Sequence, residues 1–175
     1  MIQNALTQKP LLIITGPTAS GKTKLAFQIG QHFGNCELVS ADSRQVYQKL
    51  DIGTGKEGIL KQNKTKSSLC DKYQSLRYIE EIPQWLTDFI APEANFTLAD
   101  YLDATKIVIE DIHSRGKLPI LVGGTGLYIT ALINGYNPVS NRPRSDKNPR
   151  HSNSLMPIEN SPPNYDILLL CLDIP

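Results

Sequence analysis

Residues 11–23 read Leu-Leu-Ile-Ile-Thr-Gly-Pro-Thr-Ala-Ser-Gly-Lys-Thr. The apolar run that ends before Gly16 predicts a buried strand. Four residues separate Gly16 from Gly21, and Lys22 and Thr23 follow directly, which is the spacing of a phosphate-binding loop. The two glycines allow backbone angles that a side chain would forbid, so backbone N–H groups can turn inward and form a nest for an anion. The stretch therefore predicts a strand that leads into a phosphate site.

The residues of this loop are expected to bind the phosphate groups of a diphosphate or a nucleotide. They are Gly16, Pro17, Thr18, Ala19, Ser20, Gly21, Lys22 and Thr23. Lys22 adds a positive charge, and the Thr23 hydroxyl can reach a Mg²⁺ ion bound to the same phosphates. Apolar residues recur at helical spacing over residues 22–33 and predict a helix. The positive end of its dipole would face the anion.

Further strands and helices alternate along the chain. Apolar runs predict strands at 37–40, 118–122 and 165–172, and periodic patterns predict helices at 98–114 and 127–133. Strands separated by helices imply an α/β fold with a parallel sheet covered on both faces. The phosphate loop follows the first strand, so the site is expected at the carboxyl ends of the strands.

Two polar regions carry clusters of basic residues. Residues 48–80 are weakly patterned and predict a long loop with short helical pieces. Within it, six Lys and Arg residues face only Glu57 and Asp71; they are Lys56, Lys61, Lys64, Lys66, Lys72 and Arg77. Residues 142–150 hold four Lys and Arg residues against Asp146. Two interpretations stay open, solvated loops or contact with a polyanion.

The composition is ordinary for a globular protein, with 175 residues, 40% hydrophobic, 20% charged and a net charge of +1. The three cysteines have neither metal-ligand nor disulfide spacing, which favours a reducing compartment, and we expect the cytoplasm. No apolar run approaches the ~20 residues that span a bilayer, so we expect no membrane contact. We also expect a monomer.

Three further segments are expected at the same sheet edge as the phosphate loop. They are Ser-Ala-Asp-Ser-Arg-Gln-Val-Tyr at 40–47, Asp-Ile-Gly-Thr-Gly-Lys at 51–56 and Leu-Val-Gly-Gly-Thr-Gly-Leu-Tyr at 121–128. Asp42 in the first segment can act as a base or hold a metal-bound water. After Val122 the chain has Gly-Gly-Thr, where a typical ATPase has an acidic residue that holds Mg²⁺. This difference counts against a motor-type NTPase and favours close approach of backbone and a small hydroxyl to a substrate.

Four motifs together resemble those of the tRNA dimethylallyltransferase (tRNA isopentenyltransferase, or IPP transferase) family. They are Gly-Pro-Thr-Ala-Ser-Gly-Lys-Thr at 16–23, Asp-Ser-Arg-Gln-Val-Tyr at 42–47, Asp-Ile-Gly-Thr at 51–54 and Gly-Gly-Thr-Gly-Leu-Tyr at 123–128. Their order and spacing make the resemblance far more specific than the phosphate loop alone. It implies a P-loop NTPase-like fold, in which helices flank a parallel sheet.

The family transfers a dimethylallyl group from dimethylallyl diphosphate to N6 of the adenosine beside the anticodon of tRNA. The resemblance implies that the loop, Lys22 and a Mg²⁺ ion on Thr23 hold the diphosphate leaving group. It implies that Asp42 accepts the N6 proton or hydrogen-bonds the amine, and that Thr125 positions the substrate. The residues implied to contact the flipped-out base of the tRNA are Asp42, Ser43, Arg44, Gln45 and Thr125.

Other interpretations stay open for the same residues. Asp42 can be the N-cap of a helix with no part in catalysis, and Thr125 can be merely a helix cap. The phosphate loop alone also permits a small-molecule kinase that uses ATP. A third possibility is an inactive, truncated remnant that binds diphosphates without turnover.

The expected domain organisation has three parts. Residues 1–134 form a P-loop catalytic core, and residues 165–175 form a strand that returns to it. Residues 135–164 are rich in Pro, Ser, Asn and Arg, and are expected to be a disordered or irregular linker, or a degenerate remnant of the helical insertion with which the family grips tRNA. Family members are longer, so the resemblance implies a truncated form of the fold.

Overall fold

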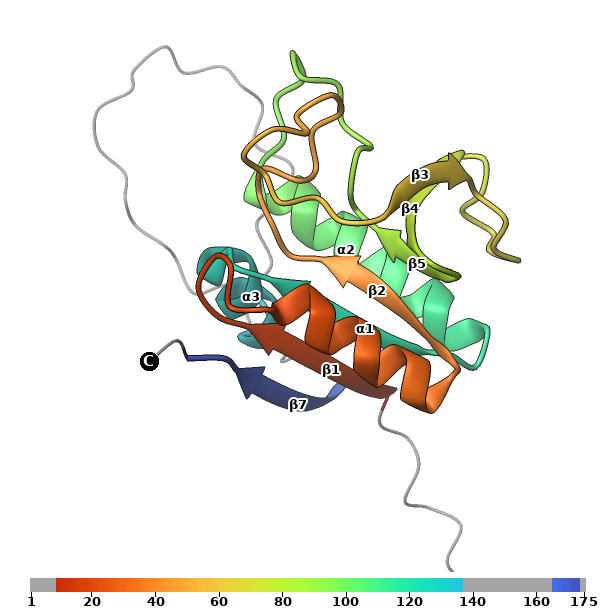
Figure 1. The fold of residues 1–175 in the computed structure, drawn as a ribbon, viewed down its shortest axis with the longest axis vertical. Helices are drawn as coiled ribbons and strands as arrows, with labels where there is room; N and C mark the ends of the chain where they lie inside the picture. Colours follow the sequence, from red (N-terminus) through yellow and green to blue (C-terminus); the bar gives the residue numbers. More distant parts are fainter. Residues whose placement is uncertain (1–8, 137–164, 174–175) are drawn as a thin grey trace, which may run out of the picture.

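A computed structural model describes residues 9–136 and 165–173. In this part of the chain, one seven-stranded sheet lies between helices (Figure 1). The strands are β1 (Lys9–Thr15), β2 (Cys36–Ser40), β3 (Ile59–Gln62), β4 (Ser75–Ile79), β5 (Ile82–Trp85), β6 (Leu118–Gly123) and β7 (Tyr165–Cys171). The helices are α1 (Lys22–Phe33), α2 (Leu98–Ser114) and α3 (Gly126–Ile133). The predicted α/β class is confirmed.

The strand order is β3-β4-β5-β2-β6-β1-β7. Strand β1 pairs in parallel with β6 and β7, and β2 pairs in parallel with β5 and β6. The carboxyl ends of β1, β2 and β6 therefore meet at one edge of the sheet, which is where the phosphate loop begins.

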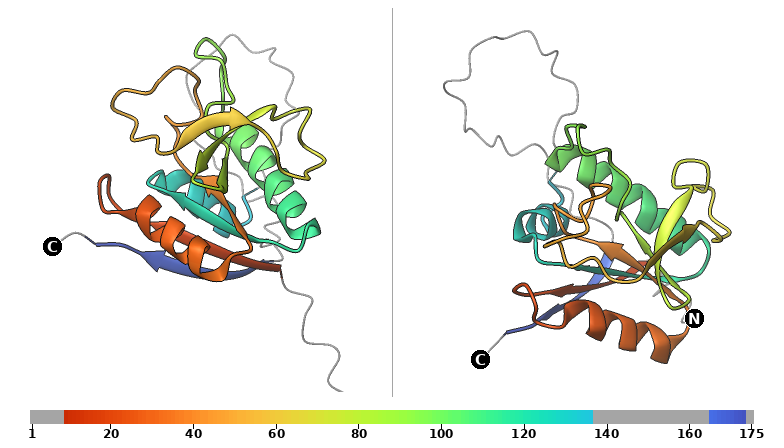
Figure 2. Two further views of the ribbon diagram at one scale, coloured as in Figure 1. Left: turned by 45° about the vertical axis from the view of Figure 1, so that its right-hand side comes forward. Right: turned by 45° about the horizontal axis from the view of Figure 1, so that its top comes forward.

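Helix α1 covers one face of the sheet, and α2 and α3 cover the other (Figure 2). Alternate residues of β1 show the division, because Leu12 and Ile14 pack with Ala26 of α1, whereas Leu11 and Ile13 join the core beneath α2. A side-chain oxygen of Thr97 accepts a hydrogen bond from Asp100 N–H, and Asp100 in turn accepts from Thr97 N–H, so a capping box begins α2. None of the helices in the described ranges is long and apolar enough to cross a membrane.

The prediction of a loop over residues 48–80 is wrong in part. Strands β3 and β4 lie within it, pair antiparallel with each other, and continue the sheet through an antiparallel β4–β5 pair. The predicted parallel sheet is therefore extended by an antiparallel hairpin at one edge. All four residues of β3 are exposed, so no burial pattern marks this strand in the sequence.

Strand β7 forms the opposite edge of the sheet and lies parallel to β1 along its whole length. Residues 165–175 were expected to contain such a returning strand, and Tyr165–Cys171 is one. Most of the predicted linker at 135–164 lies outside the described residues, as does the basic cluster at 142–150.

Candidate active site

The loop between β1 and α1 has the backbone expected of an anion nest. Three of its residues have positive φ angles: Gly16 at 151°, Ala19 at 64° and Gly21 at 82°. Gly21 is the N-cap residue of α1, whose first turn has neither an acidic residue nor a side-chain cap. The first N–H groups of a helix lack partners within it, so those of α1 remain available to an anion.

Gly16 is required by packing as well as by backbone conformation. A Cβ atom at this position would lie 2.5 Å from the carbonyl oxygen of Leu172, directly after β7. The same segment is fixed to β1, because Leu172 N–H donates to the carbonyl oxygen of Thr15 at 2.8 Å. The residues that follow β7 thus form one wall of the loop.

The side chain of Lys22 turns back into its own loop. Its Nζ contacts the carbonyl oxygen of Pro17 and lies 3.5 Å from Ser20 Oγ. Burial lowers the pKa of Lys22 from its ordinary value, and the negative charge of Asp42 acts in the opposite direction. The ammonium group of Lys22 and the carboxylate of Asp42 therefore interact within the same site.

Asp42 lies in the turn that follows β2. Its Oδ1 accepts hydrogen bonds from Arg44 N–H at 2.8 Å and Gln45 N–H at 3.3 Å. Asp42 is not the N-cap of a helix, because the residues whose N–H groups it accepts form a turn. In the described ranges no hydrogen bond reaches Oδ2, which leaves a carboxylate oxygen for a ligand.

Thr125 joins this turn to the end of β6. Its Oγ1 accepts a hydrogen bond from Ser43 N–H at 3.0 Å, and its own N–H donates to the carbonyl oxygen of Ala41 at 3.1 Å. Thr125 occupies the N-cap position of α3, but its side chain makes no capping hydrogen bond. A Cβ on Gly123 would lie 2.2 Å from Ala41 O, so glycine allows the two backbones to approach.

Gln45 fastens the following loop to the site. Its Oε1 accepts from Ser40 Oγ at 3.0 Å, and its Nε2 donates to the carbonyl oxygens of Thr54 at 3.0 Å and Gly55 at 3.2 Å. These hydrogen bonds occupy both ends of the amide that the resemblance assigned to tRNA contact. In this structure Gln45 shapes the pocket by holding residues 54 and 55.

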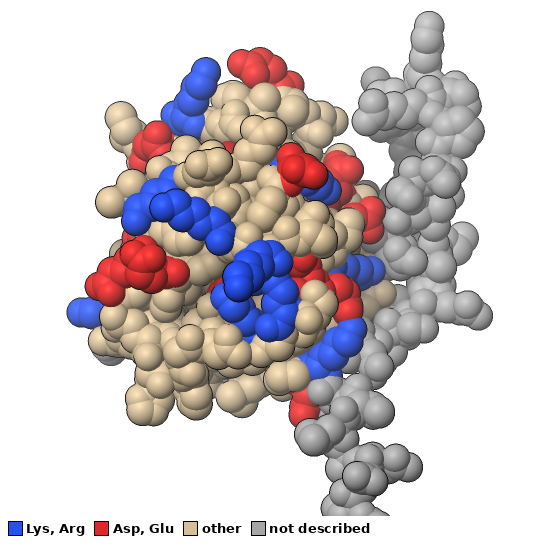
Figure 3. Space-filling model, turned by 90° about the vertical axis from the view of Figure 1, so that its right-hand side faces the viewer, with Lys and Arg blue, Asp and Glu red and all other residues tan. Residues whose placement is uncertain are grey.

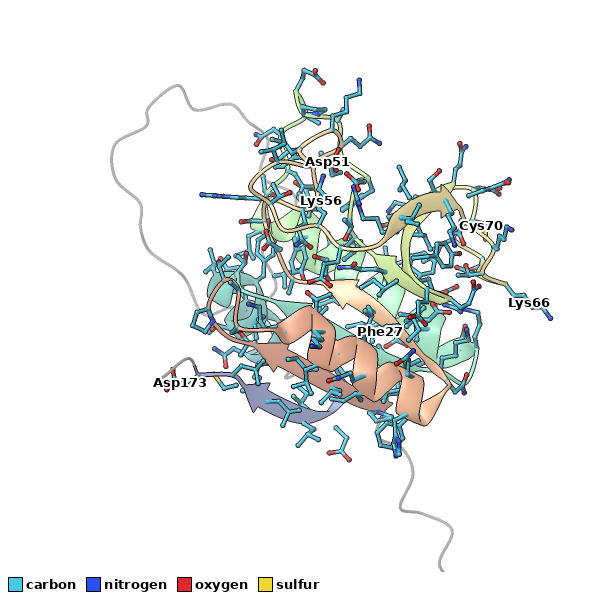
Figure 4. The ribbon with its side chains drawn as sticks, in the orientation of Figure 1. Phe27, Asp51, Lys56, Lys66, Cys70 and Asp173 are labelled. Carbon is cyan, nitrogen blue, oxygen red and sulfur yellow. The ribbon has the colours of Figure 1, made fainter. Side chains whose placement is uncertain are left out.

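An ion-pair network fixes the same loop from the other side. Lys56, whose side chain is 1% exposed, donates to Asp88 Oδ1 at 2.5 Å and lies 3.7 Å from Asp51. Arg77 donates to the second oxygen of Asp88 and to Asp51. Figure 4 shows Asp51 and Lys56 in this loop, with Lys66 at the distant β3–β4 hairpin. Lys56 and Arg77 are therefore structural cations rather than part of a free basic surface.

These segments enclose a pocket of about 220 Å³ at the carboxyl ends of β2 and β6. The predicted site residues that line it are Thr18, Ala19, Gly21, Lys22, Thr23, Asp42 and Gln45. The predicted residues that do not line it are Gly16, Pro17, Ser20, Ser43, Arg44 and Thr125, of which Pro17, Ser43 and Arg44 are exposed. The structure thus brings Lys22, Thr23 and Asp42 to one cavity, with Thr125 one hydrogen bond away through Ser43.

Six polar or glycine residues of the pocket were not among the predicted site residues, and two of them are Gly123 and Gly124 at the end of β6. Thr54, Gly55 and Glu57 come from the loop before β3, and Gln84 comes from β5. Thr54 lies in one of the four motifs, which is a signal that could have found it. Glu57 carries no motif or spacing signal. Gln84 lies in the segment Ile-Pro-Gln-Trp-Leu at 82–86, which also resembles the family, but the resemblance gave this glutamine no role.

Two protein-family models match this chain. A family model described as IPP transferase matches residues 45–162, and one described as isopentenyl transferase matches residues 9–74. The first match covers more than half of the chain. This chain belongs to the IPP transferase family.

Two curated members of the family give the scale of the similarity. The tRNA dimethylallyltransferase of Endomicrobium trichonymphae is 41% identical over 137 residues, which are 78% of this chain and 41% of that protein. The enzyme of that name from Geobacter sulfurreducens is 44% identical over 138 residues, 79% of this chain and 39% of that protein. The chain thus spans about two fifths of the length of these relatives.

Solved structures of the IPP transferase family share the fold. The tRNA isopentenylpyrophosphate transferase of Bacillus halodurans is 36% identical, with a TM-score of 0.59 over 80% of this chain and 40% of that one. The Staphylococcus epidermidis protein is 40% identical, with a TM-score of 0.57 over 73% of this chain and 36% of that one. A eukaryotic dimethylallyltransferase acting on tRNA is 31% identical, with a TM-score of 0.59 over 73% and 27% of the two chains. The predicted P-loop NTPase-like fold is confirmed.

Proposed function

We propose that this chain transfers a dimethylallyl group from dimethylallyl diphosphate to N6 of the adenosine beside the anticodon of tRNA. The observation that carries the proposal is the single pocket in which the phosphate loop and Asp42 meet. A diphosphate in the loop would leave its organic group directed toward the turn after β2. The family to which the chain belongs, with relatives named tRNA dimethylallyltransferase, supports this reaction over others available to a phosphate loop.

The residues of the loop would hold the diphosphate through its charge. The unpaired N–H groups at the start of α1 and the ammonium group of Lys22 face the same space. On diphosphate binding, we expect the Lys22 ammonium to exchange its contact with Pro17 for the anion. Donors that are already oriented stabilise the negative charge that grows on a leaving group, because they need no reorganisation during the reaction.

Asp42 would act on the acceptor amine. The N6 nitrogen attacks C1 of the dimethylallyl group, the C1–O bond breaks, and the bonding electrons leave with the diphosphate. One N6 proton passes to the Asp42 carboxylate, which restores a neutral amine. Oδ1 already accepts two backbone hydrogen bonds, so Oδ2 is the oxygen with capacity to take this proton.

The donor set around Thr23 fits a divalent cation. The hydroxyl of Thr23 and the carboxylate of Asp42 line one pocket, and oxygen ligands of this kind suit Mg²⁺. When bound, Mg²⁺ would neutralise the charge that develops on the departing diphosphate. Thr23 would hold the ion, and the N–H groups of the loop would hold the phosphate oxygens.

The test is transfer of label from radiolabelled dimethylallyl diphosphate to a tRNA that has adenosine beside its anticodon, with Mg²⁺ present. We expect labelled N6-dimethylallyladenosine after digestion of the tRNA, and loss of label with Lys22→Ala or Thr23→Ala. Binding of diphosphate with no transfer by the intact chain would contradict the proposal and favour the inactive remnant. ATP turnover without a prenyl donor would contradict it in favour of a kinase.

A further inference from the structure

Several oxygen-bearing side chains line the pocket, and four of them come from separate segments. They are Thr23 at the start of α1, Asp42 after β2, Glu57 before β3 and Gln84 in β5. No group of three or more His, Cys, Asp or Glu side chains within the described ranges could hold a metal ion. A Mg²⁺ ion here would therefore not sit in an all-protein cage. Mg²⁺ usually keeps several waters and binds through one or two protein oxygens together with substrate phosphates.

Gln84 is a buried amide with an unmet hydrogen-bonding capacity. Its side chain is almost inaccessible, since the residue is 3% exposed, and no described residue donates to its Oε1. A buried acceptor without a donor is costly, so a donor is expected to arrive with water or ligand. The neighbouring Trp85 packs in the core beneath α2, and side chains alternate along a strand, so Gln84 points to the α1 face.

The missing donor is best explained by a water molecule. An amide oxygen is an acceptor only, so Oε1 repels phosphate oxygens rather than binding them. Water bound to a divalent cation is a strong donor, because the ion draws electron density from its O–H bonds. An orphaned acceptor on a residue that lines the phosphate pocket therefore fits the hydration shell of a metal ion better than it fits the diphosphate.

Glu57 supplies the second acceptor, and it stands in a fixed loop. The preceding residue, Lys56, is anchored to Asp88 and to the carbonyl oxygen of Tyr47. No salt bridge joins Glu57 to another described residue, and its carboxylate remains exposed at the pocket. Strand β6 ends at Gly123, and Gly124 follows, so the acidic residue usual at this strand end is absent. A carboxylate from the loop before β3 offers the negative charge instead.

We propose that Gln84 and Glu57 accept hydrogen bonds from the water molecules of a Mg²⁺ ion held between Thr23 and a bound diphosphate. The assignment rests on the proposed function only in requiring a diphosphate in the phosphate loop. It gives Gln84 and Glu57 positioning roles, because they act on the ion through its waters. Loss of such outer partners typically lowers metal affinity about 10–100-fold.

The test measures binding of inorganic pyrophosphate to the full chain by calorimetry, once with Mg²⁺ and once with EDTA. We expect Gln84→Leu and Glu57→Gln to lower the affinity in Mg²⁺ about 10-fold and to leave the affinity in EDTA unchanged. Gln84→Glu keeps an acceptor oxygen and is expected to retain the advantage given by Mg²⁺. Glu81→Gln, which removes one exposed charge outside the pocket, is the matched control for Glu57→Gln.

Three results would overturn the proposal. Equal loss in Mg²⁺ and EDTA would assign Gln84 to the diphosphate or to the fold, and circular dichroism melting of each variant separates these two cases. Unchanged affinity in Mg²⁺ would show that the two side chains do not meet the ion. If the unaltered chain binds pyrophosphate no more tightly in Mg²⁺ than in EDTA, Mg²⁺ has no part in binding and the proposal is wrong. Prenyl transfer is not needed for any of these readouts, so failure of the proposed function is recognised separately.

Discussion

The two oxygens of the Asp42 carboxylate have different surroundings, and this asymmetry allows one residue to have two tasks. Oδ1 is committed to the N–H groups of Arg44 and Gln45, which holds the turn in shape. Oδ2 lacks a hydrogen bond from the described residues, and Asp42 lines the pocket that contains Lys22. A test of Asp42 therefore needs a substitution that removes the base but keeps the hydrogen bonds of the turn.

Asp42→Asn separates the two tasks, because asparagine keeps an Oδ1 acceptor for the turn but cannot accept the N6 proton. We expect transfer to fall about 10²–10⁴-fold in both Asp42→Asn and Asp42→Ala. The affinity for dimethylallyl diphosphate should stay within a few-fold of the unaltered chain, as measured by calorimetry. Transfer by Asp42→Asn at the normal rate would remove Asp42 from the role of base.

Gly123 and Gly124 are neighbours with different steric environments, so alanine substitutions at the two positions should have different effects on stability. A Cβ on Gly123 would lie 2.2 Å from Ala41 O, whereas a Cβ on Gly124 would lie 3.4 Å from its nearest neighbour, Gly16 O. We expect Gly123→Ala to lower the free energy of unfolding by about 1–3 kcal/mol. Gly124→Ala should change it by less than about 1 kcal/mol. Urea denaturation checks both values, and equal effects would contradict the close approach.

At the scale of elements, a buried charge cluster joins β2 to the end of α2. Glu37 of β2 is fully buried and accepts hydrogen bonds from Arg115, from Lys117 at 2.8 Å and from Trp85 Nε1 at 2.7 Å. Arg115 also pairs with Asp111. Burial alone would raise the pKa of Glu37, but the hydrogen bonds from Arg115, Lys117 and Trp85 outweigh it and hold the pKa below its ordinary value.

The depressed pKa of Glu37 predicts a dependence of stability on pH. A carboxyl with a lower pKa in the folded state stabilises fully above its unfolded pKa, and this contribution is lost as the pH falls through the folded pKa. We expect the free energy of unfolding to decrease from about pH 5 downward, and Glu37→Gln to flatten this decrease. At pH 7 the same substitution should cost up to about 3–5 kcal/mol. The check is urea denaturation of the unaltered chain and of Glu37→Gln over about 4 pH units, from pH 3 to 7, around the reference Glu pKa. Equal slopes of unfolding free energy against pH in the two proteins would contradict this account.

Part of this arrangement follows from the sequence, and the rest does not. The bounds of α1 and α2 match the prediction to the residue, because a phosphate loop marks one start and the Thr97–Asp100 capping box marks the other. Strand β3 was missed because it is exposed throughout and forms only by pairing with β4. The places of Lys22, Thr23 and Asp42 follow from motifs at strand ends. Gln84 lies in a segment at 82–86 that resembles the family, but its place in the pocket could not be predicted, because it depends on neighbours that are distant in the sequence.

On the scale of the whole molecule, the β3–β4 hairpin carries the basic side chains that the ion-pair networks leave free. Of the six basic residues between positions 56 and 77, Lys56 and Arg77 are paired inside the protein, and the exposed four are Lys61, Lys64, Lys66 and Lys72. Figure 3 shows basic groups across the face on this side, with acidic groups among them. The hairpin lies at the sheet edge opposite β7.

We predict that these four lysines contact the phosphate backbone of a bound tRNA. Each phosphate contact contributes about 0.7–0.9 to the slope of log affinity against log salt concentration. Replacement of all four by alanine should therefore reduce that slope by up to about 3 and weaken tRNA binding, as measured by filter binding between about 50 and 200 mM salt. Lys66→Ala alone should reduce the slope by about 0.7–0.9, and Lys24→Ala, at an exposed position on α1, is its control. An unchanged slope would favour the solvated interpretation of the hairpin.

The contact between Gly16 and Leu172 has a consequence for the order of events during synthesis. The glycine turn of the phosphate loop leaves the ribosome early, but Leu172, which packs against Gly16, is translated roughly 150 residues later. Until that segment is translated, β1 is an unpaired edge strand, and the phosphate loop lacks its contact with Leu172. Diphosphate binding by nascent chains of increasing length would then rise in one step, at the length at which Leu172 can pack against Gly16.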